Sequence, residues 1–175
     1  MGSNTHLVLY PINQQKEINL VCIIRKKLED DNSIKAILEN TILKENKNLV
    51  NLFKGDLKSW PIYISGKPIK SIYKNVLYIG DGFYTFPPTL AQGASQAIEA
   101  ANEIFELISD NHPDIQNEYF KNRVERTNLI NKRSKFNYFG FHISNPLLKI
   151  FRNKVLKILV KNKNFINSYL GKVYK

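Results

Sequence analysis

Residues 75–99 read NVLYIGDGFYTFPPTLAQGASQAIE and carry most of the structural information in this chain of 175 residues. The apolar run at 76–79 predicts a short core strand, and a Gly-Asp pair that ends in Asp81 follows it directly. After a Pro-Pro loop, a Gln-Gly-Ala turn opens an amphipathic helix. In layered α/β folds, ligands bind in the crevice beyond the carboxyl ends of the strands. The stretch therefore predicts a site for a polar, extended cofactor.

Each part of this stretch has a physical reason to contact such a cofactor. The carboxylate of Asp81 can accept hydrogen bonds from sugar or ribityl hydroxyl groups, although an Asp here also suits a cap of the next turn. Pro87 and Pro88 predict an extended loop. The backbone N–H groups at Gln92-Gly93 are free donors near the positive end of a helix dipole. Small residues at this turn leave room for a flat ring.

Together, the Gly-Asp pair, the Pro loop and the Ala-Gln-Gly turn resemble the second FAD-binding motif of the single-component flavin monooxygenases. These are aromatic-ring hydroxylases related to p-hydroxybenzoate, salicylate and ubiquinone-pathway hydroxylases. The resemblance implies FAD as cofactor, NAD(P)H as transient reductant, O₂ as co-substrate and a small aromatic or quinone-precursor substrate. It assigns FAD binding to Gly80, Asp81, Pro88, Gln92, Gly93 and Ala94. It assigns substrate-facing positions to Tyr10, Phe86 and Pro87.

The chain also departs from that family. Where the family has Gly-Asp-Ala-Ala-His, residues 80–84 read Gly-Asp-Gly-Phe-Tyr. No Gly-x-Gly-x-x-Gly occurs in these 175 residues, although the family needs an N-terminal dinucleotide-binding fold that carries it. We therefore expect this chain to be the C-terminal part of a monooxygenase, either a fragment or one half of a split enzyme. We expect the chain alone to be inactive. Its partner would be the missing N-terminal half. No catalytic side chain and no metal ligand is assigned.

The remaining chain supplies strands first and helices later. Two β-rich runs separated by the polar residues 11–17 predict an antiparallel hairpin from residues 6–10 and 18–24, and a short strand is expected at 60–64. Apolar residues at helical spacing predict one or two short helices within residues 33–52. Longer helices are expected at about 90–109, 115–135 and 147–161, followed by a short amphipathic tail, 162–175.

The pattern also predicts which faces of these helices are covered. In the helix at 90–109 we expect an inward stripe of Ala94, Ala97, Ile98, Ala101, Ile104, Phe105 and Ile108. In the second helix we expect exposed faces with Arg123, Arg126, Lys132 and Arg133. In the third we expect inward positions for Leu148, Phe151, Val155, Ile158 and Leu159.

The expected fold class is α+β, a partial flavin-monooxygenase fold. N-terminal antiparallel strands of the substrate domain precede one core strand and a C-terminal helical half. Residues 1–70 are read as a remnant of the substrate-domain sheet with short helices, and residues 71–111 as the FAD-binding strand, loop and helix. Residues 112–175 are read as basic C-terminal helices.

Charge is distributed unevenly along the chain. Residues 119–175 carry 14 basic residues and one acidic residue, whereas residues 1–118 carry 12 basic and 14 acidic residues. The alternative function is therefore a basic module without catalytic activity that binds a membrane surface or nucleic acid. The basic residues have helical spacing and do not form a block, which favours a compositional origin of this charge in a chain rich in Lys, Asn and Ile. Peripheral membrane contact through the basic tail stays open as an expectation, and nucleic acid is not an expected partner. With one cysteine, Cys22, and no signal peptide, a cytoplasmic location is expected, and the basic tail is compatible with a peripheral position at the inner membrane.

Overall fold

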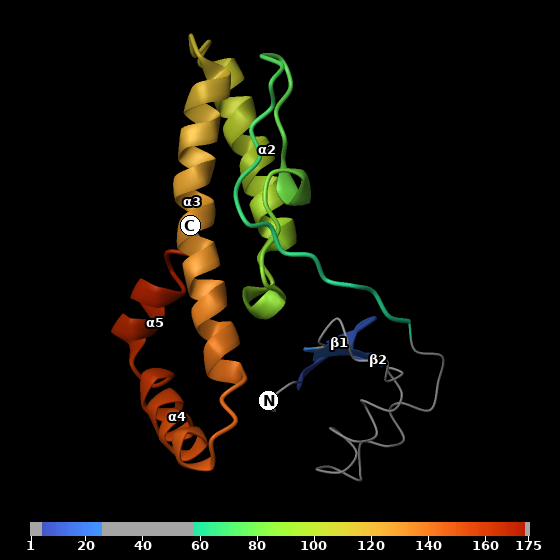
Figure 1. Cartoon of the computed structure of the whole chain (residues 1–175), viewed down its shortest axis with the longest axis vertical. Helices are drawn as coiled ribbons and strands as arrows, with labels where there is room; N and C mark the ends of the chain where they lie inside the picture. Colours follow the sequence, from blue (N-terminus) through green and yellow to red (C-terminus); the bar gives the residue numbers. More distant parts are fainter. Residues whose placement is uncertain (1–4, 26–57, 174–175) are drawn as a thin grey trace. The chain divides into compact units, whose positions relative to one another are not determined.

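A computed structural model describes residues 5–25 and 58–173 (Figure 1). Two compact units form: Met1–Trp60 with Gly140–Lys163, and Pro61–Phe139 with Asn164–Lys175. The described elements are, in chain order, β1 (Thr5–Ile12), β2 (Glu17–Ile24), the 3₁₀ turns η3 (Gly80–Gly82) and η4 (Pro88–Leu90), and the helices α2 (Gly93–Ser109), α3 (Ile115–Phe141), α4 (Pro146–Leu159) and α5 (Lys163–Tyr169).

These elements confirm the coarse α+β class among the described residues. The short helices expected within 33–52 fall outside the described residues. The predicted division into 1–70, 71–111 and 112–175 concerns function and stays a prediction. No helix in the described part of the chain has the length and apolar content needed to cross a bilayer.

The hairpin forms as predicted in the first unit. Strands β1 and β2 pair antiparallel, with Thr5 opposite Ile24 and Ile12 opposite Glu17. Tyr10 lies opposite Asn19, whose side-chain amide donates a hydrogen bond to the Tyr10 hydroxyl at 2.6 Å. Both strands are short runs rich in Leu, Val, Ile and Tyr, separated by a polar turn, so the local sequence indicates them.

In the second unit, α2 and α3 lie side by side (Figure 1). The buried cluster between these helices and the chain before them contains Phe83, Tyr84, Ala100 and Tyr119. The ring of Phe83 meets that of Tyr119 edge to face at 6.0 Å between centroids. The buried Tyr119 hydroxyl donates to the Tyr78 carbonyl at 2.8 Å, and burial raises its pKa to about 12. This cluster fixes the segment around residue 81 against the helices.

The predicted inward stripe of α2 is largely wrong. Ile98, Phe105 and Ile108 are exposed, whereas Gln96 and Ala100 are buried against the rest of the unit. The apolar pattern correctly identified an amphipathic helix. It did not indicate that, among the described residues, the more apolar side of α2 is exposed to solvent.

The prediction that the arginines of α3 lie on its exposed faces is wrong for Arg123. Its side chain is 5% exposed and forms ion pairs with Glu99 at 2.6 Å and Glu103 at 2.7 Å. Arg126 also pairs with Glu99, at 2.7 Å. Burial alone would raise the pKa of Glu99, but hydrogen bonds from Arg126 and Arg123 lower it overall. A buried arginine is stable only when carboxylates surround it, as they do here.

Arg126 also contacts the end of the chain. Its two terminal nitrogens donate to the main-chain carbonyls of Lys172 and Val173. The Val173 side chain is buried. Nearby, Arg133 donates to the Tyr169 carbonyl and lies over the Tyr169 ring, 5.0 Å from its centroid. Residues after α5 are thereby fixed against α3.

The two strands expected before Asp81 are absent. Residues 60–64 and 76–79 are irregular, although Ile79 has an extended backbone with φ −125° and ψ 162°. A strand is defined by a hydrogen-bonded neighbour, and no described segment pairs with residues 76–79. Side chains of α3 reach carbonyls of this segment instead, as the Tyr119 hydroxyl does at Tyr78. The segment therefore has an extended backbone at Ile79, as expected, but lacks the neighbouring strand that would make it part of a sheet.

The third predicted helix forms as α4, but its predicted inward face is partly wrong. Leu148, Phe151 and Ile158 are exposed, and Val155 and Leu159 are half-buried. Asn145 caps the helix by accepting hydrogen bonds from the N–H groups of Leu147 and Leu148. The helix is thus well defined, while much of its apolar surface is uncovered.

A pair of histidines in the first unit predicts a pH dependence of its stability. His6 on β1 is buried, and its Nδ1 lies 3.3 Å from Nε2 of His142, which follows α3. Burial, and then the neighbouring His142, lower the pKa of His6 below its usual 6.5. The unfolded chain therefore binds a proton more readily than the folded chain, so stability is complete above about pH 6.5 and falls as the pH drops toward the folded pKa.

We expect the free energy of unfolding to decrease when the pH is lowered from about 7.5 to about 5.5. Chemical denaturation followed by circular dichroism at the two pH values measures this. His6→Gln should flatten the dependence. Equal pH dependence in the variant and the native chain would contradict the assignment to His6.

Candidate functional site

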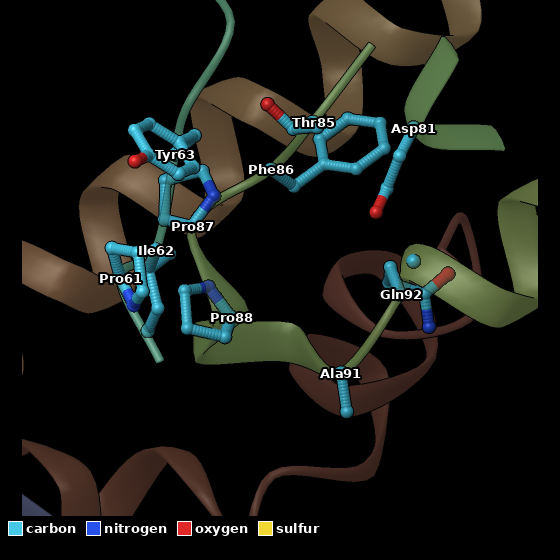
Figure 2. A pocket seen from close by; sticks show the side chains of 11 residues that line it. Pro61, Ile62, Tyr63, Asp81, Thr85, Phe86, Pro87, Pro88, Ala91 and Gln92 are labelled. Atoms are coloured by element: carbon cyan, nitrogen blue, oxygen red, sulfur yellow. The ribbon is translucent and has the colours of Figure 1, made fainter. Parts of the chain in front are cut away.

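A cavity of about 420 Å³ opens in the second unit around the sequence motif. Its size lies within the range of small-molecule pockets. In Figure 2, Asp81 and Gln92 lie on one side, and Tyr63, Pro87 and Pro88 lie on the other. The lining residues are Pro61, Ile62, Tyr63, Asp81, Thr85, Phe86, Pro87, Pro88, Ala91, Gln92 and Gly93.

Asp81 is the only acidic residue of this lining. It lies in η3, directly after the extended segment, and its side chain is exposed. No described residue donates a hydrogen bond to its carboxylate or forms an ion pair with it. Its side chain does not cap the following turn either. Asp81 therefore presents an acceptor to the cavity that the described chain does not use.

The N-terminus of α2 provides donors on the same side of the cavity. Gln92 is the N-cap residue, and no side chain caps the first turn of the helix. A Cβ added to Gly93 would meet no atom within 4 Å, so the space in front of this residue is open. Uncapped N–H groups at a helix start attract negative or carbonyl oxygen atoms. The buried Gln92 side chain accepts a hydrogen bond from Gln96 at 3.4 Å, which fixes its position.

The loop between these two features is held by the rest of the unit. Pro87 is extended, with φ −56° and ψ 134°, but Pro88 begins η4, so the expected extended Pro-Pro loop is correct only for its first residue. The Thr89 hydroxyl donates to the Ser134 carbonyl of α3 at 2.7 Å. Ala91 adopts the left-handed region, with φ 52°, which costs about 1–2 kcal/mol for a residue with a Cβ. A strained residue in a cavity wall is typical of a binding site.

The opposite wall comes from residues 61–63, which the sequence analysis did not assign to the site. Hydrogen bonds between Ser65 and Thr85 hold this segment beside the loop. The Thr85 hydroxyl lies 2.7 Å from the Ser65 main-chain nitrogen and 3.0 Å from its hydroxyl. The main-chain N–H of Ile69 donates to the Phe83 carbonyl at 3.1 Å. The aromatic and proline content of residues 60–63 was the available signal, but it indicated a strand equally well.

Gly80 has a structural role beside the cavity. Its φ of +54° lies in the left-handed region, and a Cβ added here would lie 3.1 Å from the Cβ of Ala97 on α2. A Cβ at this position would press against the helix, and the positive φ favours glycine in any case. The close neighbour of Gly80 in the structure is thus α2, and the role of this glycine in FAD binding stays a prediction.

We expect Gly80→Ala to lower the free energy of unfolding by about 1–2 kcal/mol, because alanine is strained at this φ and its methyl group crowds Ala97. Urea denaturation followed by circular dichroism measures the change. The matched control is Gly82→Ala, where a Cβ meets nothing within 4 Å. If the two variants unfold at the same urea concentration, the close packing of Gly80 on α2 is wrong.

Most of the predicted site residues meet at the cavity. Asp81, Pro88, Gln92 and Gly93 line it, as do the substrate-facing candidates Phe86 and Pro87, whereas Gly80 and Ala94 adjoin the lining without forming part of it. Tyr10 belongs to the other compact unit, so its substrate-facing role stays a prediction.

Among the described residues, no group of three or more His, Cys, Asp or Glu side chains is placed to hold a metal ion.

Comparison with known proteins adds no assignment to this geometry. No known family, no curated protein and no solved structure matches the chain significantly.

Proposed function

We propose that this chain is the C-terminal part of an FAD-dependent monooxygenase and that the cavity around Asp81 binds the flavin half of FAD. The observation that carries the proposal is the meeting of three features in one cavity. These are a carboxylate that no described residue uses, the uncapped start of α2 and the open space in front of Gly93. A hydroxylated chain and a flat ring with carbonyl oxygens at its edge match these features in chemistry.

The residues have distinct parts in this arrangement. Asp81 accepts hydrogen bonds from ribityl hydroxyl groups. The N–H groups at the start of α2 donate to the carbonyl edge of the ring, where negative charge increases on reduction. Phe86 and Pro87 shield the ring from water, and the loop keeps its shape because Thr89 is bonded to α3. FAD, once bound and reduced by NAD(P)H, supplies the oxygen chemistry for hydroxylating an aromatic or quinone-precursor substrate.

Uncovered apolar surface in the second unit supports an N-terminal half that completes the enzyme. One side of α2 exposes Ile98, Phe105 and Ile108, and the extended segment exposes Val76 and Ile79. Single exposed apolar residues are common, but a stripe along a helix indicates a surface that another element covers. Residues beyond these 175, on the same or a second polypeptide, would supply this element and the dinucleotide-binding fold.

Complementation tests the proposal. The chain is produced together with the polypeptide encoded directly upstream of it, and the purified material is examined for flavin absorbance and NAD(P)H oxidation. We expect a yellow complex, whereas the chain alone with added FAD should bind flavin poorly and turn nothing over. NAD(P)H oxidation by the chain alone would contradict the half-enzyme assignment. An upstream product that carries Gly-x-Gly-x-x-Gly but gives a colourless complex would contradict the function itself.

A further inference from the structure

Helix α4, in the first unit, has an exposed apolar stripe. The exposed fractions are 76% for Leu147, 67% for Phe151 and 68% for Ile158. Spacings of four and seven residues place these side chains on one face of the helix. Leu148 and Ile150 beside them are also more than half exposed. The opposite side is better covered, because Arg152 donates to the Gly140 carbonyl at 3.0 Å. The helix is thus held on one side and open on its apolar side.

The charged residues on and beside the stripe are all positive. Lys154 lies on the same face, seven residues after Leu147 and four before Ile158, and Lys157 and Lys161 follow it. Lys154, Lys157 and Lys161 are exposed in and just after α4, and none has an ion-pair partner among the described residues. No acidic residue occurs anywhere after Glu125. Lysine side chains combine a long apolar stem with a charged end, so they extend readily from an apolar surface into a polar layer.

The exposed stripe of α2 gives a useful contrast. Its apolar residues lie next to Asn102 and Glu106, which are exposed and bonded to each other at 2.8 Å. A surface of that kind suits a protein neighbour. The stripe of α4, whose charged neighbours are all lysines, would meet like charge on the same face of a second copy of this chain. Nucleic acid would pair with the lysines but leave Leu147 and Phe151 in water. Of these three occupants, an anionic lipid surface is the one that satisfies both parts.

We propose that α4 is a membrane-surface anchor. Leu147, Phe151 and Ile158 enter the boundary between headgroups and acyl chains of an anionic bilayer, and Lys154 and Lys157 contact the headgroup phosphates. A helix with a basic polar border and an apolar face lies in the plane of such an interface. Its 14 residues span roughly 20 Å along the surface. The proposal does not depend on flavin binding.

Vesicle co-sedimentation of the full chain tests the anchor. One set of vesicles is phosphatidylcholine alone, and the other is an equal mixture of phosphatidylcholine and phosphatidylglycerol. We expect binding to the anionic vesicles that weakens with salt, and little binding to the neutral ones. Equal binding to both sets, or none to either, would overturn the proposal.

Two variants separate the apolar and charged contributions. The triple variant Leu147→Ser, Phe151→Ser and Ile158→Ser should partition at least about a hundredfold more weakly. Lys154→Gln with Lys157→Gln should partition about tenfold to thirtyfold more weakly. The matched control is Lys67→Gln with Lys74→Gln, which removes the same charge from exposed positions of the other unit and should retain most of the binding.

Further measurements distinguish a lipid surface from a second copy of the chain as the neighbour of the α4 stripe. All substituted side chains are exposed, so circular dichroism should show native helix content in every variant. If the triple variant sediments with anionic vesicles as the native chain does, the stripe is not inserted and the proposal is wrong. If the native chain ignores vesicles but self-associates, and the triple variant is monomeric, a second copy covers α4 and the proposal is again wrong.

Discussion

Asp81→Ala should weaken FAD binding by the complemented enzyme about a hundredfold or more while leaving the fold intact. A hydrogen bond to a charged group contributes about 1.5–3 kcal/mol, and two ribityl hydroxyl groups are within the capacity of one carboxylate. The fold should not suffer, because no described residue bonds to this side chain. Flavin retention after gel filtration and fluorescence titration with FAD measure the effect.

Asp110→Ala is the matched control, since Asp110 is exposed at the end of α2, away from the cavity lining. Gly93→Val gives an independent check. Its side chain would occupy space that is open in the structure, so it should exclude the ring without disturbing the packing of the unit. An Asp81→Ala enzyme that keeps its flavin as firmly as the Asp110→Ala enzyme would show that the cavity is not the flavin site.

The second large effect is expected at the ion pairs between α2 and α3. Arg123→Met keeps much of the side-chain volume but removes the charge that Glu99 and Glu103 share. Removing one partner of a buried ion pair typically costs 3–5 kcal/mol. Because both carboxylates retain some solvent contact, we expect a loss near the lower limit, about 3 kcal/mol. Urea denaturation of the chain measures it.

Lys121→Met provides the comparison on the same helix. Its ion pair with Glu118 is 3.8 Å long, and the lysine side chain is 73% exposed, so its loss should change stability by less than about 1 kcal/mol. Combining Arg123→Met with Glu103→Gln should recover part of the loss, because one uncompensated charge is then absent. Equal unfolding midpoints for Arg123→Met and Lys121→Met would refute the structural role of Arg123.

Local sequence predicted the elements that depend on local interactions. The hairpin occurs where two β-rich runs predicted it, and three of the helices occur where apolar periodicity predicted them. Helix α3 extends beyond its predicted end at residue 135 and includes the aromatic residues up to 141. The prediction of a strand at 76–79 was wrong because a strand does not form from local interactions alone. Strand formation depends on neighbours far away in sequence, and the described residues supply none for this segment.

Side-chain environment was harder to predict than helix position. An arginine on an amphipathic helix normally faces water, and only the approach of Glu99 and Glu103 from α2 makes burial of Arg123 possible. Similarly, apolar spacing identifies a stripe but not what covers it. In the candidate site, Asp81 and Gly93 came from one continuous motif and were predictable. Tyr63 joins them through the bonding of Ser65 to Thr85, which no local pattern encodes.

The contact between Arg126 and the end of the chain has a consequence for sequence tolerance. The guanidinium group binds main-chain carbonyls of Lys172 and Val173, and every amino acid offers the same carbonyl. The side chain at 172 can therefore vary without loss of this contact. The length of the segment cannot, since shortening it removes the acceptors themselves. Homologous chains should thus vary at position 172 while keeping the spacing that brings the carbonyls of residues 172 and 173 to Arg126.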